Sequence, residues 1–141
     1  MKGERRNSSG ELKSYAIDTG VIMHHYFKKD LDEILKRSLV NKVTISEVLY
    51  VLCRVEGLRN ALNFISDIAG KIIVPSSNST ALVAGQFKCK YPIALADCWV
   101  LATAKVNGVP ALFESREEEI VKRLSKIEQE VEIEFLDELV N

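Results

Sequence analysis

The sequence predicts an α/β fold: a three-layer α/β/α sandwich around a central parallel sheet of about four to five strands. Short apolar runs alternate along the chain with longer segments of helical periodicity, which is the pattern of parallel βαβ units. The 141 residues suffice for one domain with a substantial core, and 47% of them are hydrophobic. We therefore expect a flexible polar leader over residues 1–14 and a single domain over residues 15–141.

The composition argues against several classes of protein. No run approaches the ~20 uncharged apolar residues of a membrane-spanning helix, and the first residues lack the apolar segment of a secretory signal. Three cysteines without a CxxC spacing, Cys53, Cys89 and Cys98, support neither a disulfide framework nor a zinc ribbon. We therefore expect a cytoplasmic protein without a membrane partner. The net charge of -1 does not by itself demand a polyanionic ligand.

The first elements follow from short-range patterns. Residues 15–17 are a brief apolar run that ends at Asp18, and they predict the first strand. Residues 21–37 predict one or two helices. A break near Lys29 would let Asp30 cap the second of them.

A second strand and two helices are predicted next. Residues 42–45 are short and β-branched, as in a strand. The helix that starts at Ser46 has apolar residues at i, i+3, i+4 and i+7, and Gly57 ends it. A further helix is expected over residues 58–69, before a glycine.

The middle of the chain predicts a strand and two more helices. Residues 71–75 are a third strand candidate, because Pro75 ends any helical pattern. Residues 78–90 form a helical stretch. Pro92 then opens an alanine-rich helix that stops at Asn107.

The last elements are a strand, a helix and a strand. Residues 109–113 are an apolar run and predict a strand. A charged helix is expected over residues 115–129. Residues 131–135 alternate with period two, which predicts an edge strand.

Carboxylates occur where a parallel sheet binds its ligands, beyond the carboxyl ends of the strands. Asp18 and Glu114 directly follow predicted strands, and Glu47 comes just after another, in the first turn of its helix. Asp97 is embedded in the most apolar helix, where an unpaired charge would cost several kcal/mol. Taken singly, the acids have structural explanations, such as a helix cap at Asp18, a favourable dipole position at Glu47 or a charged surface at Glu114.

The four acids together predict a metal site. Carboxylates gathered at one edge of a sheet repel one another, and a divalent cation relieves the repulsion. Oxygen ligands without a nearby histidine or cysteine suit Mg²⁺ or Mn²⁺ rather than Zn²⁺.

Three segments of the sequence resemble the motifs of PIN-domain nucleases. Residues 16–21 (AIDTGV) resemble the first motif, residues 44–48 (TISEV) the second, and residues 95–104 (LADCWVLATA) the third. The resemblance covers roughly residues 15–136. The fourth motif departs from the family, in which a strand runs into Thr-x-Asp. Here Glu114 takes that place, with Ser115 or Glu117 as alternatives under a shifted register.

The resemblance implies a metal-dependent endoribonuclease, most similar to the VapC-type toxins of toxin–antitoxin pairs. It implies Asp18, Glu47, Asp97 and Glu114 as catalytic residues, with supporting hydroxyl groups from Thr19 and Ser46. It also implies that Asp18, Asp97 and Glu47 hold the Mg²⁺ or Mn²⁺ ion. The metal would activate water and clamp the scissile phosphate, leaving a 5′-phosphate and a 3′-hydroxyl. An RNA substrate, a homodimer and a cognate antitoxin are the implied partners.

Alternatives remain at the level of single residues and of the whole function. We expect His24 and His25 to be surface or RNA-proximal side chains rather than metal ligands. Tyr50, Trp99 and Cys98 are expected in the core. A catalytically weakened PIN domain that binds RNA or protein is the alternative function. An acyl-phosphate signalling domain is disfavoured, because no aspartate follows the strand predicted at residues 71–75.

Overall fold

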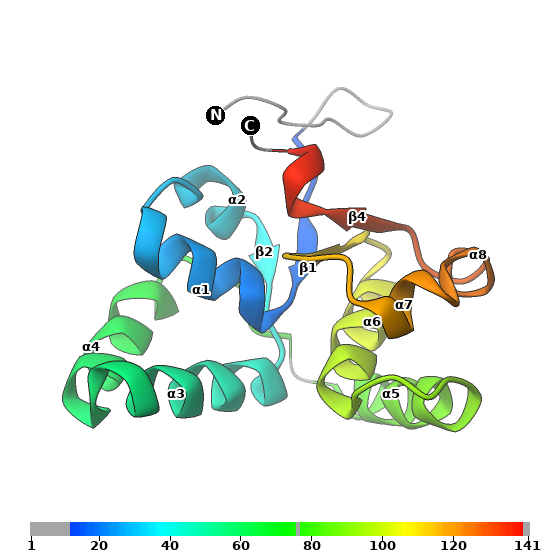
Figure 1. Ribbon diagram of the computed structural model, residues 1–141, viewed down its shortest axis with the longest axis horizontal. Helices are drawn as coiled ribbons and strands as arrows, with labels where there is room; N and C mark the ends of the chain where they lie inside the picture. The colour runs from blue at the N-terminus through cyan, green and yellow to red at the C-terminus, as the bar shows by residue number, and fades with distance from the viewer. Residues whose placement is uncertain (1–11, 76, 140–141) are drawn as a thin grey trace.

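The computed structural model describes residues 12–75 and 77–139, and its centre is a parallel sheet of four strands (Figure 1). The strands are β1 (Tyr15–Ile17), β2 (Ser38–Leu39), β3 (Ala111–Phe113) and β4 (Ile133–Phe135), in the order β2-β1-β3-β4. All three pairings are parallel. The predicted α/β class and the edge position of the last strand are therefore confirmed.

Helices cover both faces of this sheet (Figure 1). On one side lie α1 (Thr19–Lys28), α2 (Asp32–Lys36), α3 (Lys42–Glu56) and α4 (Leu58–Ala69). On the other lie α5 (Asn78–Lys90), α6 (Leu95–Asn107), α7 (Glu118–Val121) and α8 (Leu124–Ile127). A 3₁₀ turn, η1 (Leu136–Glu138), follows β4.

Alternating strand residues divide the core into two clusters. Tyr15 and Ile17 of β1 pack with the first group of helices, whereas Ala16 between them packs with the second group. Leu112 and Phe113 of β3 divide in the same way. The sheet is therefore buried on both faces, as is typical of parallel sheets between two helical layers.

The strand predicted over residues 42–45 is wrong. These residues form the first turn of α3, because the Asn41 side chain caps the helix and accepts a hydrogen bond of 2.8 Å from the Thr44 amide. A cap of this kind stabilises a helix by about 1 kcal/mol, more than the helix penalty of any one β-branched residue. The second strand is instead Ser38–Leu39, just after the helical segment predicted over residues 21–37.

The strand predicted over residues 71–75 contributes only one bridging residue. Ile73 pairs in parallel with Leu39, and its amide donates to the Ser38 carbonyl at 2.9 Å. The segment thus extends the β2 edge without forming a full strand. In the described residues the sheet has four strands, at the lower end of the predicted range.

The helix predicted over residues 115–129 is divided into α7 and α8. Glu117 is extended, so the helix starts only at Glu118. Around Arg123 the backbone makes hydrogen bonds that span three residues instead of four. The Arg123 amide donates to the Ile120 carbonyl at 3.1 Å, and the Lys126 amide donates to the Arg123 carbonyl at 3.1 Å. Few of these charged side chains enter the core, so packing provides little support for one continuous helix.

The turn between α1 and α2 corrects two further expectations. Asp30 does not cap α2, whose N-cap is Leu31; it pairs instead with His24, with an Nε2–Oδ1 distance of 3.1 Å. His25 is buried, and its Nδ1 accepts the Leu31 amide hydrogen at 3.2 Å. Burial lowers the pKa of His25, which favours the neutral ring that an acceptor nitrogen requires. His25 is therefore a structural residue of this turn and not a surface side chain.

The aromatic and cysteine expectations have mixed outcomes. Cys98 is fully buried and Trp99 packs partly buried against the core, as predicted. Tyr50 was expected in the core, but it is 52% exposed, and the Arg54 guanidinium lies 5.0 Å from its ring centre. It lies on the face of α3 turned away from the buried Val48 and Leu52, which explains the error.

The described end of the predicted leader contacts the sheet. The Lys13 ammonium lies 2.9 Å from the Glu134 carboxylate, which is nearly buried in β4 and also accepts the Tyr15 hydroxyl hydrogen at 3.2 Å. Residues 1–11 lie outside the described residues, so the leader as a whole stays a prediction. Within the described ranges, every helix is too short or too polar to cross a lipid bilayer.

Candidate active site

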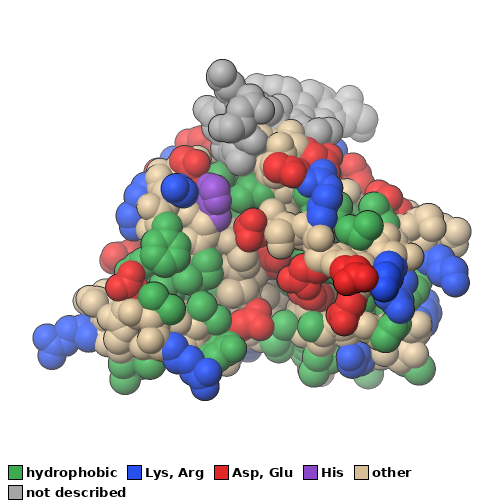
Figure 2. All heavy atoms as spheres, viewed as in Figure 1, with side chains coloured by type: hydrophobic (Ala, Val, Ile, Leu, Met, Phe, Trp, Pro, Cys, Tyr) green, Lys and Arg blue, Asp and Glu red, His purple; other side chains and the backbone are tan. Residues whose placement is uncertain are grey.

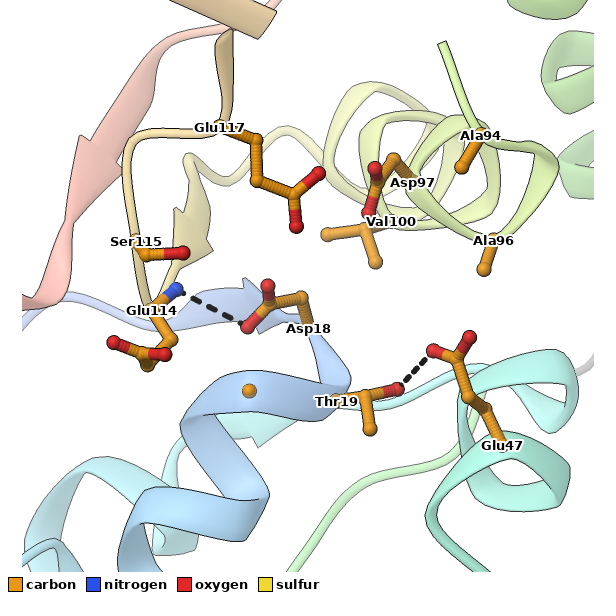
Figure 3. Close-up of a pocket in the computed structure, with 11 residues that line it drawn as sticks. Asp18, Thr19, Glu47, Ala94, Ala96, Asp97, Val100, Glu114, Ser115 and Glu117 are labelled. Carbon is orange, nitrogen blue, oxygen red and sulfur yellow. Dashed lines mark hydrogen bonds between the residues drawn. The ribbon is translucent and has the colours of Figure 1, made fainter. Parts of the chain in front are cut away.

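The parallel pairing of β1 and β3 brings two of the predicted acids together. Ile17 is in register with Leu112, and the Asp18 amide donates to the Leu112 carbonyl at 3.2 Å. In return, the Glu114 amide donates to Asp18 Oδ1 at 3.2 Å (Figure 3). The two residues that follow these strands are therefore neighbours, as the sheet-edge argument predicts.

Asp18 is both a helix cap and a wall of the site. Its Oδ1 accepts the Val21 amide hydrogen at 2.9 Å, so it caps α1, while the residue also lines a cavity. Burial raises the pKa of Asp18 from 3.8 to about 7, and the negative charges of Asp97 and Glu114 act in the same direction. The hydrogen bonds from the Val21 and Glu114 amides lower the pKa of Asp18, but they offset only part of this rise. Asp18 thus has a structural role as the cap of α1 and, at the same time, a position in the candidate site.

Asp97 faces this cavity from the first turn of α6. Burial raises its pKa from 3.8 to about 7, and the next causes are the charges of Glu117 and Glu47. Asp18 is buried and Asp97 is half-buried, and two acids with raised pKa values in one concave site are a recognised mark of a functional centre.

Glu47 enters the cavity from the other side of the sheet. It lies on α3, one turn further into the helix than predicted, since α3 begins at Lys42. The Thr19 hydroxyl donates a short hydrogen bond to the Glu47 carboxylate and thereby fixes its orientation (Figure 3). Thr19 lies in the predicted supporting position. Ser46 is exposed and does not line the cavity.

The two candidates for the fourth acid point in different directions. Glu117 extends into the cavity toward Asp97, whereas the carboxylate of Glu114 is turned away from Asp97 (Figure 3). Glu117 was an alternative from the sequence, and it is the one that faces Asp97. Glu114 lines the edge of the cavity, and its catalytic role stays a prediction.

These groups enclose a cavity of about 200 Å³. Its walls come from both helical layers: Asp18, Thr19, Gly20, Glu47, Ala94, Ala96, Asp97, Val100, Glu114, Ser115 and Glu117. Figure 2 shows acidic side chains gathered in the middle of this face, between the helices on either side. Every charged group in the lining is a carboxylate, which is the donor set of a hard divalent cation.

The geometry limits how such a cation could be held. Among the described residues, no three His, Cys, Asp or Glu side chains converge closely enough to enclose one ion. Magnesium in proteins is commonly bound by one or two carboxylates while water fills the other positions. The residues present fit that mode of binding.

One feature of the site was missed in the sequence. Gly20 lies where α1 passes the end of β3, and a Cβ at this position would be 2.6 Å from the Glu114 Cβ. Only glycine permits this approach without a backbone shift. The glycine directly after Asp18-Thr19 was visible in the sequence, but its need depends on a tertiary contact.

Comparisons with known proteins were made for both sequence and fold. The family model described as the PIN domain matches residues 15–123, and no curated protein matches the sequence. DNA-bound VapBC from Salmonella typhimurium has a TM-score of 0.69 at 14% identity, covering 87% of this chain and 98% of its own.

Two further solved structures share the fold. VapBC-1 from nontypeable Haemophilus influenzae has a TM-score of 0.60 at 13% identity, covering 86% of this chain and 96% of its own. A toxin-antitoxin complex from Klebsiella pneumoniae has a TM-score of 0.55 at 17% identity, covering 76% of this chain and 90% of its own. The family match spans β1 to α7 and includes Asp18, Glu47, Asp97 and Glu117, so this chain belongs to the PIN domain family.

Proposed function

We propose that the protein is a Mg²⁺- or Mn²⁺-dependent endoribonuclease and a toxin of the VapC type. The observation that carries the proposal is the acidic cavity, where carboxylates from both helical layers face one another. The pKa values of Asp18 and Asp97 rise to about 7 there, because burial and neighbouring carboxylates disfavour the ionised forms. A bound cation would stabilise the ionised forms. The shared fold with VapBC proteins supports the toxin assignment.

In this proposal Asp18 and Asp97 hold the metal directly, and Glu47 and Glu117 act through water. When bound, the metal supplies a Lewis acid that lowers the pKa of water and neutralises charge on the scissile phosphate. This binding mode is supported by the all-oxygen lining and by the finding that, among the described residues, no three His, Cys, Asp or Glu side chains enclose one ion.

The chain's own residues orient the reactants. The hydroxyl of Thr19 fixes Glu47, whose carboxylate we assign to orient the attacking water and accept its proton. The amides of Val21 and Glu114 hold Asp18 in place. The water oxygen attacks phosphorus as its proton passes to Glu47, the bond from phosphorus to the 3′-oxygen breaks, and the leaving 3′-oxygen takes up a proton from solvent water. The products are a 5′-phosphate and a 3′-hydroxyl.

The proposal includes partners and location. Because a similar fold occurs in a toxin-antitoxin complex, we propose a cognate antitoxin for this chain as well. A homodimer and a cytoplasmic location complete the proposal, on the basis of the resemblance to VapC-type proteins and of the cysteine content.

A cleavage assay tests this function. Purified protein is incubated with structured RNA and with single-stranded DNA, in EDTA, Mg²⁺ or Mn²⁺. We expect metal-dependent cleavage of RNA, lost by at least about 100-fold in Asp18→Asn and Asp97→Asn, as for loss of a group that stabilises the transition state. Asp67→Asn, an exposed carboxylate on α4, is the matched control and retains full activity.

The same assay separates the alternative function. Binding of RNA by the wild type without cleavage in any metal would favour a weakened PIN domain that acts as a binding module. Equal cleavage by wild type and Asp97→Asn would contradict the assigned site.

A further inference from the structure

A second cavity adjoins the acidic one. It has a volume of about 310 Å³ and is lined by Gly20, Met23, His24, Phe27, Lys28 and Glu114. Gly20 and Glu114 line both cavities, so the two cavities adjoin one another. None of the other four residues has a part in the proposed chemistry.

One face of α1 forms most of this second cavity. Positions 20, 23, 24 and 27 are spaced i, i+3, i+4 and i+7, so their side chains share a face of the helix. The opposite face, with Val21, Ile22 and His25, is buried in the core. The helix that provides most of this lining is therefore held in place by the packing of its opposite face against the core.

Phe27 is exposed but supported. Its side chain is 57% exposed, yet its ring meets the ring of Tyr26 edge-to-face at 5.0 Å. Tyr26 in turn meets Phe64 edge-to-face at 5.0 Å. An exposed aromatic ring held in this way offers a flat, preorganised surface to a ligand.

The remaining polar groups fit a nucleotide. The exposed ammonium of Lys28 has no ion-pair partner within residues 12–75 and 77–139, so it is available to a phosphate. The Glu114 carboxylate, turned away from Asp97, accepts hydrogen bonds only and would repel a phosphate (Figure 3). A ligand that presents N–H donors to Glu114, a flat ring to Phe27 and a negative charge to Lys28 satisfies all three.

We propose that this second cavity binds the nucleobase next to the scissile phosphate, with Phe27 as the stacking platform and Glu114 as the acceptor for the N–H edge of the base. The inference rests on the proposed function, because it requires the scissile phosphate to occupy the acidic cavity, with which the second cavity shares Gly20 and Glu114. Unpaired RNA bases are commonly recognised by aromatic stacking together with hydrogen bonds to their edges. A base with two adjacent N–H donors, such as guanine, fits a carboxylate acceptor best.

An abasic substrate tests the stacking. The cleavage site is mapped on an RNA oligonucleotide, and the two bases beside it are removed in turn. For the wild type, loss of the relevant base should lower kcat/KM by about 100-fold, because the stacking on Phe27 and the hydrogen bonds to Glu114 are lost together. Phe27→Ala should lower kcat/KM about tenfold on the intact RNA and cause no further loss on the abasic RNA, whereas Phe27→Trp should retain activity.

Binding gives a readout that is independent of turnover. An RNA with carbon in place of the bridging 3′-oxygen cannot be hydrolysed, and 2-aminopurine replaces the base beside it. Its fluorescence should be quenched by the wild type and not by Phe27→Ala. Tyr50→Ala, which removes an equally exposed aromatic ring outside both cavities, is the matched control and should preserve quenching.

Glu114→Gln tests the hydrogen bonds to the base. We expect KM to rise about tenfold for the preferred base with little change in kcat, and the preference among the four bases to weaken. A fall in kcat at unchanged KM would instead place Glu114 in the chemistry and overturn its assigned role.

The outcomes distinguish the two proposals. If the wild type neither binds nor cleaves RNA, the proposed function fails and the base site with it. If the wild type cleaves RNA but Phe27→Ala and base removal have additive or no effects, only the base site fails. Loss of antitoxin binding in Phe27→Ala with unchanged RNA cleavage would mark the cavity as a peptide site and would also overturn it.

Discussion

At the scale of single residues, the site is defined by two aspartates, Asp18 and Asp97, whose pKa values of about 7 leave them only partly ionised at neutral pH. The raised pKa of Asp97 has burial as its main cause, followed by the charges of Glu117 and Glu47. For Asp18 burial is again the largest cause, and two amides oppose it. The fold therefore maintains a cluster that weakens its own stability, as functional sites often do.

The stability of the metal-free protein should fall as pH rises from about 4 to 8. Because the pKa values of Asp18 and Asp97 are higher in the folded state than the ordinary 3.8, the folded state binds more protons across this range than the unfolded state. The free energy of unfolding therefore decreases with increasing pH. Asp97→Asn should remove the part of this decrease that is caused by ionisation of Asp97. It should therefore raise the free energy of unfolding at pH 8 by about 2 kcal/mol, as measured by urea unfolding in EDTA.

The pH series provides its own control. At pH 4 the raised pKa values of Asp18 and Asp97 keep both residues protonated in the folded state, so Asp97→Asn and the wild type should unfold at nearly the same urea concentration. A wild type that is more stable at pH 8 than at pH 5 in EDTA would contradict the assigned repulsion.

Thr19 should act on turnover and not on RNA binding. Thr19→Val keeps the shape of the side chain but removes the hydroxyl that fixes Glu47. We expect kcat to fall about tenfold, as for loss of one orienting hydrogen bond, with KM unchanged. Thr19→Ser restores the hydroxyl and should restore kcat, and failure of this rescue would assign the effect of Thr19→Val to packing.

At the scale of elements, the site depends on how closely α1 passes the end of β3. Gly20→Ala would place a methyl group 2.6 Å from the Glu114 Cβ, which the backbone of one element must move to avoid. Thr19 of α1 and Glu114, which directly follows β3, both line the acidic cavity, so we expect lower stability and a large loss of metal-dependent cleavage. The measurements are thermal unfolding and the RNA cleavage assay.

Gly85→Ala is the matched control for this change. Gly85 lies in α5, and a Cβ there has no heavy atom within 4 Å. Replacing glycine by alanine in a helix interior commonly stabilises by about 0.5–1 kcal/mol, so this variant should be slightly more stable and fully active. If Gly20→Ala behaved in the same way, the close approach would have no role in the site.

The elements also show what the sequence could predict. The apolar strands and the rule that ligands bind at their carboxyl ends were enough to bring Asp18 and Glu114 together. The start of α3 was not predicted, because β-branched residues 43–45 suggest a strand and the capping contact of Asn41 outweighs them. The orientation of Glu117 toward Asp97 is set by the extended turn before α7, and no local pattern encodes it.

At the scale of the whole molecule, the cavity lies between the two helical layers. Asp18 follows a strand of the central sheet, Glu47 comes from the α1–α4 layer, and Asp97 and Glu117 come from the opposite side. Repulsion among them acts across the sheet, and a bound cation would connect the layers. Metal binding should therefore stabilise the entire fold and not only one segment.

We expect Mg²⁺ or Mn²⁺ to raise the thermal midpoint, and to raise it more at pH 8 than at pH 5. At a metal concentration of about 100 times Kd, the gain for a ligand that binds only the folded state is about 2.7 kcal/mol, which corresponds to several degrees in a domain of this size. The gain is larger at pH 8 because protons compete with the metal for Asp18 and Asp97, whose pKa values lie near 7. Asp97→Asn should lose most of the shift, and Asp67→Asn should keep it. An equal shift in both variants would mean that the cation acts elsewhere on the acidic surface, and the connection between the two layers would then have to come from packing alone.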